Sequence, residues 1–376
     1  MIHTIRIIKE IYPKQIPRIL SGFGFKKSIE EITQTGIETV NLSKRYPASG
    51  IKYISVICYI TNYGNCRGLC KYYCLLGFEP QMMLLGKRTM TLYTPTDDHN
   101  LLLSSIFSST LFCFLGDNTI TNDLLNLSSW IVSRIDYSFN LRFNSDTEVR
   151  HFLALTKKTS LYQHTNQQRI EKIKLKDQST AEGNGSYKII CYDKKKQVEE
   201  TYNGISDVEK QRLLTEANGM VRFEVQCRKG ALNAIKEKHH FHDKAILHYL
   251  NTDIATEVLL SKYQTAVGFE DFFSRYHAQK LININEDNKP QMKQKLLHLL
   301  QLIAQACSVC NAKKQFLKGT FIRNTEIFVH GSKEQFRDRL QRLRSLNINP
   351  VLLPKEWHLT FLRNPIHQLY RALPPV

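Results

Sequence analysis

A tyrosine placed among lysines is the first feature of this sequence that could do chemistry. Tyr192 follows a short apolar run, Ile189–Cys191, which predicts a strand. Alternate residues of a strand share a face, so Lys188, Tyr192 and, if the strand continues, Lys194 are predicted to point the same way. Positive charge favours the phenolate form of tyrosine, which is a nucleophile. The simpler interpretation is a half-buried strand tyrosine with solvated lysines beyond it.

Two more strands are predicted by strict alternation of apolar and polar residues, at 134–142 and 221–228. Each polar face, predicted to face outward, carries one carboxylate, Asp136 or Glu224, two residues after an arginine. One interpretation is a pair of solvated faces with cross-strand ion pairs. The other is a single sheet face on which both carboxylates bind a hard cation through oxygen, beside Tyr192.

Three blocks of sequence occur together in the middle of the chain. They are Ser-Arg-Ile-Asp-Tyr-Ser-Phe (133–139), Lys-Ile-Ile-Cys-Tyr-Asp-Lys (188–194) and Gly-Met-Val-Arg-Phe-Glu-Val (219–225), with a weaker echo at 79–86. In order and approximate spacing they resemble the replication initiators of filamentous phages, the phage and plasmid gene II/X protein family. The resemblance covers roughly residues 130–230.

The resemblance implies a rolling-circle enzyme that nicks and rejoins one DNA strand through a covalent tyrosyl-DNA intermediate. Its nucleophile would be Tyr192, and its Mg²⁺ or Mn²⁺ ligands would be Asp136 and Glu224. We expect Lys194 and Lys188 to stabilise the phenolate or the phosphate. The implied partners are double-stranded origin DNA, single-stranded DNA, and a helicase and a polymerase of a bacterial host.

The chain departs from the family pattern at three positions. Gln197 stands where a glutamate is usual, Lys87 replaces the histidine of a Gly-His-Asn sequence, and His3 replaces an acid. The alternative is therefore a decayed, non-catalytic copy that binds DNA, or a repressor.

Composition favours a nucleic-acid partner. Lys plus Arg number 52 and Asp plus Glu number 34, which gives a net charge of +18. Such an excess favours a polyanion. The segment Met1–Ile8 does not look like an export signal, and nine cysteines then suggest reduced thiols in a cytoplasm. The best membrane candidate, Leu101–Leu115, is short and rich in serine, so we predict a buried helix and no membrane partner.

The expected fold is α+β. A catalytic nicking and joining domain with a mostly antiparallel sheet and flanking helices is predicted for residues 1–230, and a mainly helical DNA-binding or accessory region for 231–376. Strands are also predicted at 1–8, 53–62 and 72–76. Periodicity and capping signals predict helices at 97–115, 122–132, 146–156, 206–219, 231–238, 243–262, 291–306 and 332–346.

Basic residues outside the tyrosine block are candidates for DNA contacts. The polar segment 164–186 carries lysines on alternate positions, which suits either a basic hairpin near phosphates or a solvated strand. The helix at 332–346 is either a DNA-contacting helix or an ordinary amphipathic one. The candidate DNA-binding residues are Arg134, Arg222, Lys172, Lys174, Lys176, Arg337, Arg339, Arg342 and Arg344.

A competing metal motif lies at His240-Phe241-His242. Histidines at alternate strand positions can share a cation, and Tyr249 or Tyr263 would then become the candidate nucleophile. A basic cluster at a helix boundary is the favoured interpretation, because an apparent helix follows at once.

Overall fold

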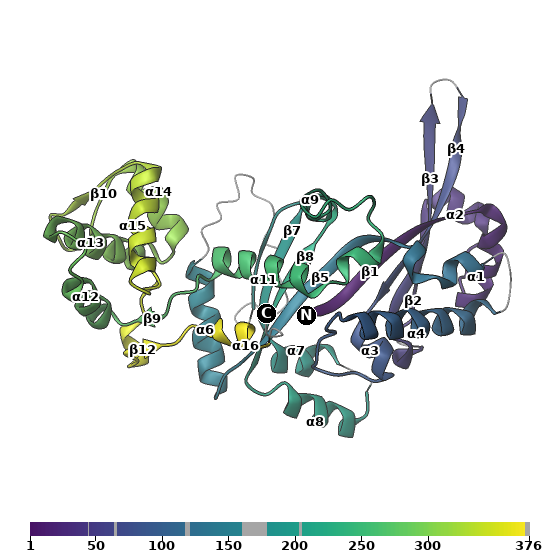
Figure 1. Cartoon of the computed structure of the whole chain (residues 1–376), viewed down its shortest axis with the longest axis horizontal. Coiled ribbons are helices and arrows are strands. Elements are labelled where there is room, and N and C mark those ends of the chain that lie inside the picture. The colour runs from purple at the N-terminus through teal and green to yellow at the C-terminus, as the bar shows by residue number, and fades with distance from the viewer. Residues whose placement is uncertain (44, 64–65, 117–120, 160–178, 203–204, 373–376) are drawn as a thin grey trace.

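The computed structural model describes residues 1–43, 45–63, 66–116, 121–159, 179–202 and 205–372. The protein is α+β, as the sequence predicts. One antiparallel sheet of eight strands runs in the order β2-β3-β4-β1-β5-β8-β7-β6, with helices flanking it (Figure 1). Its strands are β1 (Ile2–Ile11), β2 (Ile37–Asn41), β3 (Ile51–Tyr63), β4 (Cys66–Phe78), β5 (Ile131–Arg142), β6 (Ser179–Gly183), β7 (Tyr187–Asp193) and β8 (Met220–Cys227).

Eleven helices of the described chain accompany the sheet. They are α1 (Ile16–Phe23), α2 (Ile29–Thr35), α3 (Pro80–Leu85), α4 (Asp97–Leu115), α5 (Asn122–Leu125), α6 (Asp146–Thr159), α7 (Lys194–Thr201), α8 (Asp207–Glu216), α9 (Lys229–Lys238), α10 (Ile246–Tyr249) and α11 (Thr252–Ala266). No helix in the described ranges is long and apolar enough to span a membrane.

The rest of the chain is mainly helical, as predicted, and forms a lobe at one end of the molecule (Figure 1). It contains α12 (Arg275–Ile284), α13 (Pro290–Ala306), α14 (Val309–Lys318), α15 (Lys333–Ser345) and the short strands β9 (Phe272–Phe273), β10 (Thr320–Phe321), β11 (Phe328–Val329) and β12 (Phe361–Leu362). The last helix, α16 (His367–Ala372), returns to the sheet and packs against β5. The domain boundary after residue 230 stays a prediction, while α9 and α11 beyond it pack against β5 and β8.

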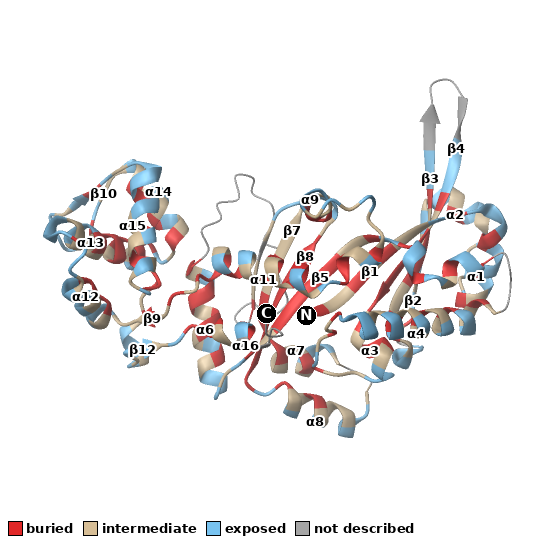
Figure 2. Ribbon diagram, viewed as in Figure 1, coloured by how far each residue is buried: buried red, intermediate tan, exposed pale blue. Residues whose placement is uncertain are grey.

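Both faces of the central strands are buried (Figure 2). On one face, Phe139 and Phe223 pack against Tyr263 of α11, with ring centroids 5.6 Å and 5.2 Å from it. On the opposite face lie the polar residues of β5 and β8, beneath α7. The prediction that this polar face points outward is therefore wrong: every residue of β8 is buried.

Two predicted helices are interrupted where an asparagine side chain binds the backbone. The helix expected at 122–132 stops as α5, because Asn126 accepts from the Ser128 amide and β5 begins at Ile131. The helix expected at 243–262 divides into α10 and α11, because Asn251 caps α11 by accepting from two of its amides. Asparagine side chains compete with the helical hydrogen bonds in this way.

Candidate active site

Strand register brings the residues of the three sequence blocks to one sheet face. Tyr192 on β7 lies opposite Arg222 on β8, and Glu224 lies opposite Ser138 on β5. Asp136 is two pairs further along β5, opposite Gln226. Paired residues share a face, so Asp136 and Glu224 are diagonal neighbours on the face that carries Tyr192.

Side chains from other segments complete a buried network on this face, which we name the polar cluster. Three of its members, Asp136, Lys194 and Arg222, are each only 1% exposed. The cluster consists of His3, Lys52, Glu79, Asp136, Tyr192, Lys194, Arg222 and Glu224.

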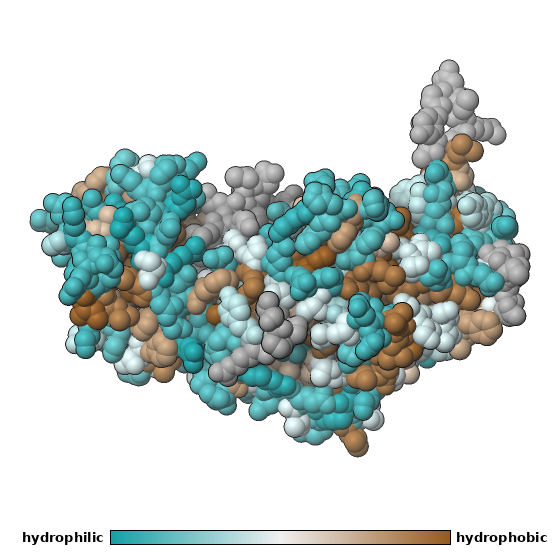
Figure 3. Space-filling view, viewed as in Figure 1, coloured by the Kyte–Doolittle hydropathy of each residue, from teal (hydrophilic) through white to brown (hydrophobic). Residues whose placement is uncertain are grey.

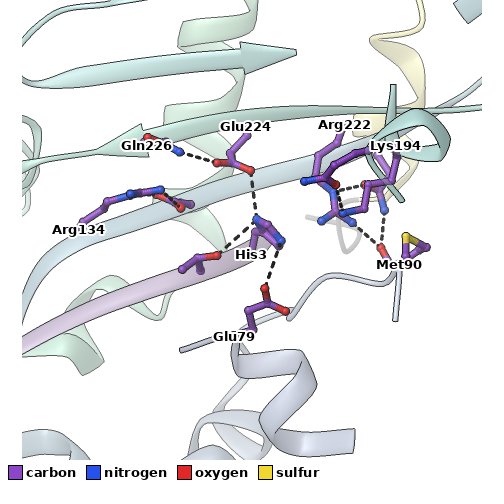
Figure 4. Close-up of polar contacts among 12 residues, drawn as sticks. His3, Glu79, Met90, Arg134, Lys194, Arg222, Glu224 and Gln226 are labelled. Carbon is purple, nitrogen blue, oxygen red and sulfur yellow. Dashed lines mark hydrogen bonds and ion pairs between the residues drawn. The ribbon is translucent and has the colours of Figure 1, made fainter. Parts of the chain in front are cut away.

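His3 lies between two carboxylates of the cluster (Figure 4). Its Nδ1 is 3.1 Å from Oε2 of Glu224, and its Nε2 is 4.0 Å from Oε1 of Glu79. Burial and the charge of Arg222 lower the pKa of His3 to about 4, so the ring is neutral at pH 7. A neutral ring that donates from Nδ1 to Glu224 leaves Nε2 as an acceptor.

Glu224 and Glu79 are held as carboxylates. Burial would raise the pKa of Glu224, but hydrogen bonds from His3 and Gln226 outweigh it and keep that pKa below its ordinary value. Burial likewise opposes ionisation of Glu79, yet Lys52, whose Nζ is 2.6 Å away, brings the Glu79 pKa to about 2. In the sequence, Glu79 belongs only to the weak echo of the family pattern, and no motif contains Lys52.

Asp136 is held differently from Glu224. Arg134 donates to both of its oxygens, at 2.7 Å and 2.6 Å. Burial and the nearby charge of Glu224 nevertheless raise the pKa of Asp136 to about 7. The two carboxyl groups therefore titrate far apart, an arrangement that can separate an acid from a base.

Lys194 reaches Tyr192 from a helix and not from the strand, which corrects the prediction that the strand might continue. Asp193 ends β7 and caps α7, because its side chain accepts from the Lys196 amide at 3.1 Å. Lys194 Nζ lies 5.8 Å from the centroid of the Tyr192 ring and donates to Gln197 at 2.6 Å. Lys188 shares the face of Tyr192 but lies four residues, roughly 13 Å, back along the strand.

The ionisation of this pair differs from the sequence expectation. Burial, with the charge of Glu224, raises the pKa of Tyr192 well above its ordinary value, although Arg222 acts in the opposite direction. Burial and Arg222 lower the pKa of Lys194 well below its ordinary value. Burial therefore disfavours both the phenolate of Tyr192 and the ammonium of Lys194, and an amine in this position could accept the phenolic proton.

One backbone segment covers the polar cluster. We name residues 87–92 the Met90 strap. The carbonyl oxygen of Met90 accepts from Arg222 at 2.7 Å and from Asn140 at 3.0 Å. Helix α8 ties the same segment down through Arg212, which donates to the carbonyl of Arg88 at 2.6 Å. Tyr192 is only 6% exposed in this arrangement.

A divalent cation does not fit the residues as they are arranged here. The donor chemistry is suitable, because Asp136 and Glu224 offer oxygen and the buried hydroxyl of Ser138 has no hydrogen-bond partner in the structure. However, Arg134 holds both oxygens of Asp136, and His3 and Gln226 hold those of Glu224. Among the described residues, no three His, Cys, Asp or Glu side chains gather to hold a metal ion.

The competing histidine motif is not on a strand. His240 has a left-handed backbone with φ of 56° just after α9 ends, so His240 and His242 do not alternate along a sheet face. Tyr249 and Tyr263 are buried on the apolar side of the sheet, and their hydroxyls donate to Leu232 and Asn364. The favoured interpretation as a helix-boundary cluster agrees with this geometry.

The candidate DNA-binding residues occupy several environments. Lys172, Lys174 and Lys176 lie outside the described residues. Arg134 and Arg222 contact the protein itself, as given above. Their DNA roles stay predictions.

Helix α15 carries the other four arginines, and the surface over α14 and α15 is mostly hydrophilic (Figure 3). Arg337 is exposed, and Arg339 stacks over Phe316 at 4.8 Å. Arg342 pairs with Asp338 at 3.0 Å, and Arg344 lies 3.6 Å from the buried Glu270. Their contact with DNA stays a prediction.

The shifts of His3 and Asp136 predict opposing effects of pH on stability. The unfolded chain protonates His3 near pH 6.5 and the folded chain near 4, so acid between these values destabilises the fold. Asp136 is protonated near 7 when folded and near 3.8 when unfolded, so the same acid stabilises the fold through Asp136. In the wild-type protein the two effects oppose each other, so the pH dependence of the free energy of unfolding reveals neither group.

His3→Gln should expose this cancellation. We expect the free energy of unfolding of the wild type, relative to that of the variant, to fall by up to about 1.4 kcal/mol per pH unit between pH 6.5 and 5. Urea denaturation with a chelator present measures it. Parallel pH profiles for the two proteins would contradict the burial of a neutral His3.

Comparison with known proteins adds one positive finding. Residues 91–252 match the family model that describes the N-terminal part of the gene II replication-associated protein of phages. No curated protein and no solved structure matches the chain. The matched segment contains Asp136, Tyr192 and Glu224. The match over residues 91–252 supports a phage replication-associated initiator role of the gene II type for this chain.

Proposed function

We propose that this initiator nicks one strand of double-stranded origin DNA and later rejoins it, with Tyr192 as the nucleophile. The observation that carries the proposal is the position of Tyr192 beside Lys194, on the same sheet face as Asp136 and Glu224. The nucleophile and a proton acceptor are thereby placed beside one another in one buried network.

The proposed reaction uses three residues of the polar cluster. The Tyr192 hydroxyl attacks phosphorus while its proton passes to the Lys194 amine. The bond from phosphorus to the 3′ oxygen breaks, and that oxygen takes a proton from solvent. Arg222 stabilises charge on the phosphate oxygens. The reverse sequence rejoins the strand, and Lys188 contacts the backbone further along.

The need for Mg²⁺ or Mn²⁺ stays a prediction. If Asp136 and Glu224 bind the ion, it would offset charge on the phosphate, and they would first have to exchange their present hydrogen-bond partners. Dialysis against a chelator and titration with Mn²⁺ tests this. We expect nicking to return with Mn²⁺ in the wild type, and a higher Mn²⁺ requirement in Glu224→Gln.

A denaturing gel tests the proposed function. The protein is incubated with supercoiled origin plasmid, and labelled DNA that stays attached to the denatured chain is measured. An origin-dependent adduct with a free 3′-hydroxyl supports the proposal. Origin binding without any nick, under all metal conditions, would instead support the non-catalytic alternative that Gln197 and Lys87 leave open.

The remaining partners follow from this role. We propose that single-stranded DNA is the product held during transfer, and that a host helicase and polymerase act on the exposed 3′ end. The reaction would then take place in the cytoplasm of a bacterial host.

Helix α15 should contribute affinity and not chemistry. Replacing Arg337, Arg339 and Arg342 by Gln is expected to weaken DNA binding. It should also reduce the magnitude of the slope of log K, the DNA association constant, against log salt concentration by up to about 3, because fewer phosphate contacts release fewer counterions on binding. Arg344 is left intact because it neighbours buried Glu270. The Arg→Lys triple variant keeps the charge and is the control. An equal slope in all three proteins would exclude α15 from the interface.

A further inference from the structure

Two phenylalanines face solvent on the short hairpin of the helical lobe. Phe321 of β10 is directly opposite Phe328 of β11, and their ring centroids are 5.1 Å apart. The two side chains are 61% and 56% exposed, whereas Ile322 and Val329, which follow them in the chain, are buried. Figure 1 shows β10 at the outer end of the lobe, on the side away from the large sheet. The hairpin thus buries one face and presents a pair of rings on the other.

The surrounding structure holds these rings in place. Gln305 of α13 binds the hairpin backbone: its side chain donates to the carbonyl of Phe321 at 3.2 Å and accepts from the amide of Arg323 at 2.7 Å. Gly319 leaves room for the ring of Phe328, because a Cβ atom at that position would lie only 2.6 Å from it. The exposed rings are therefore preorganised, which lowers the entropic cost of binding a ligand on them.

Positive charge surrounds the exposed rings. The segment 311–333, which contains the hairpin, has five lysines and arginines and one acidic residue. Lys314 and Lys318 lie one turn apart on α14, just before β10, and Arg323 lies just after β10. All three side chains are exposed. A surface of this charge favours an anionic ligand.

Single-stranded DNA has both of the features that this surface would recognise. Its unpaired bases stack on aromatic rings, and its phosphates bind lysine and arginine. The exposed His330 offers a third ring, 6.5 Å from that of Phe328 and within 18° of parallel to it. Duplex DNA fits less well, because its bases are already stacked on one another.

We propose that this hairpin binds about two or three bases of single-stranded DNA by stacking. The bases lie on Phe321, Phe328 and His330, which we name the aromatic platform, and the phosphates lie along Lys314 and Lys318. The inference deepens the proposed function by naming where the displaced strand is held, and this role in replication rests on that function. Binding at the platform does not use the nucleophile, so the two can be tested separately.

An apolar contact with another protein, or with a second copy of this chain, is the alternative. Such a contact needs apolar surface but no flat aromatic face. Replacing both phenylalanines by Leu keeps the surface apolar and removes the rings, whereas replacing both by Tyr keeps the rings. The two double variants therefore separate base stacking from ordinary apolar docking.

Fluorescence anisotropy with labelled oligo(dT), which contains no origin sequence, measures the binding. We expect Phe321→Leu/Phe328→Leu to lower the association constant at least about tenfold, and the double Tyr variant to stay within about twofold of the wild type. Phe361→Leu is the matched control and should bind normally, because it makes the same change at a phenylalanine of the same lobe that is 44% exposed. Thermal melting confirms that the variants fold.

Removing the bases from the DNA should abolish the difference between the proteins. An abasic oligonucleotide with the same number of phosphates should bind the wild type and the double Leu variant equally, and so should duplex origin DNA. Equal affinity of these two proteins for oligo(dT), or an equally large loss with abasic DNA, would overturn this inference and leave the proposed nicking intact. Base-dependent loss in a protein that forms no origin adduct would support the platform and overturn the nicking alone.

Discussion

Replacing Tyr192 by Phe is expected to lower the rate of the first DNA-protein linkage by at least about a thousandfold. The change removes the only oxygen of the side chain that could bond to phosphorus. The ring stays, so its packing beside Lys194 and in the sheet should survive. Denaturing gels with labelled origin DNA measure the linkage, and thermal melting measures the fold.

Measuring origin-DNA affinity and identifying the residue that carries the DNA adduct make this test specific. The Tyr192→Phe variant should bind origin DNA with nearly wild-type affinity, because phenylalanine keeps the shape of the site. Linkage at the wild-type rate, mapped to Tyr249 or Tyr263, would remove Tyr192 from the mechanism and bring the histidine motif forward.

Replacing Arg222 by Ala is expected to lower the free energy of unfolding by about 3–5 kcal/mol. Arg222 is 1% exposed and donates to Asn140 and to the carbonyl of Met90. Without it, the buried charge of Glu224 loses a compensating cation, and the Asn140 side-chain oxygen loses its donor. Urea denaturation measures the change.

An exposed arginine gives the matched comparison for Arg222. Arg337→Ala on α15 should leave the urea midpoint unchanged, because surface substitutions of this kind cost little. If Arg222→Ala were as stable as Arg337→Ala, the polar cluster would not be the tightly packed network described here.

The central strands could be predicted because their signal is local. Alternation in 134–142 and 221–228 is a property of neighbouring residues, and it correctly placed Asp136 and Glu224 on one face. Alternation alone does not predict that this polar face is buried. Polar side chains ordinarily face water, but here they satisfy one another, which permits burial.

The rest of the cluster depends on long-range contacts. His3 and Glu224 are 221 positions apart, and no pattern within a strand or helix predicts their hydrogen bond. Strand alternation predicts Lys194 near Tyr192, and Lys194 does lie there, but it is the first residue of helix α7 and not part of the strand. The Asp193 side chain ends the strand and starts α7, and that capping preference was available in the sequence.

If Arg222 binds a DNA phosphate as proposed, the Met90 strap is a competitor for the substrate within the same chain. A carbonyl oxygen already occupies the hydrogen-bond donor that Arg222 would offer to a phosphate oxygen. Because the carbonyl belongs to the same chain, its effective concentration at Arg222 is high and independent of dilution. Part of the DNA-binding free energy must therefore be used to displace it, and the measured affinity is lower than the contacts alone would give. Short or misplaced DNA, which makes too few other contacts to displace the carbonyl, is thus discriminated against before any bond is broken.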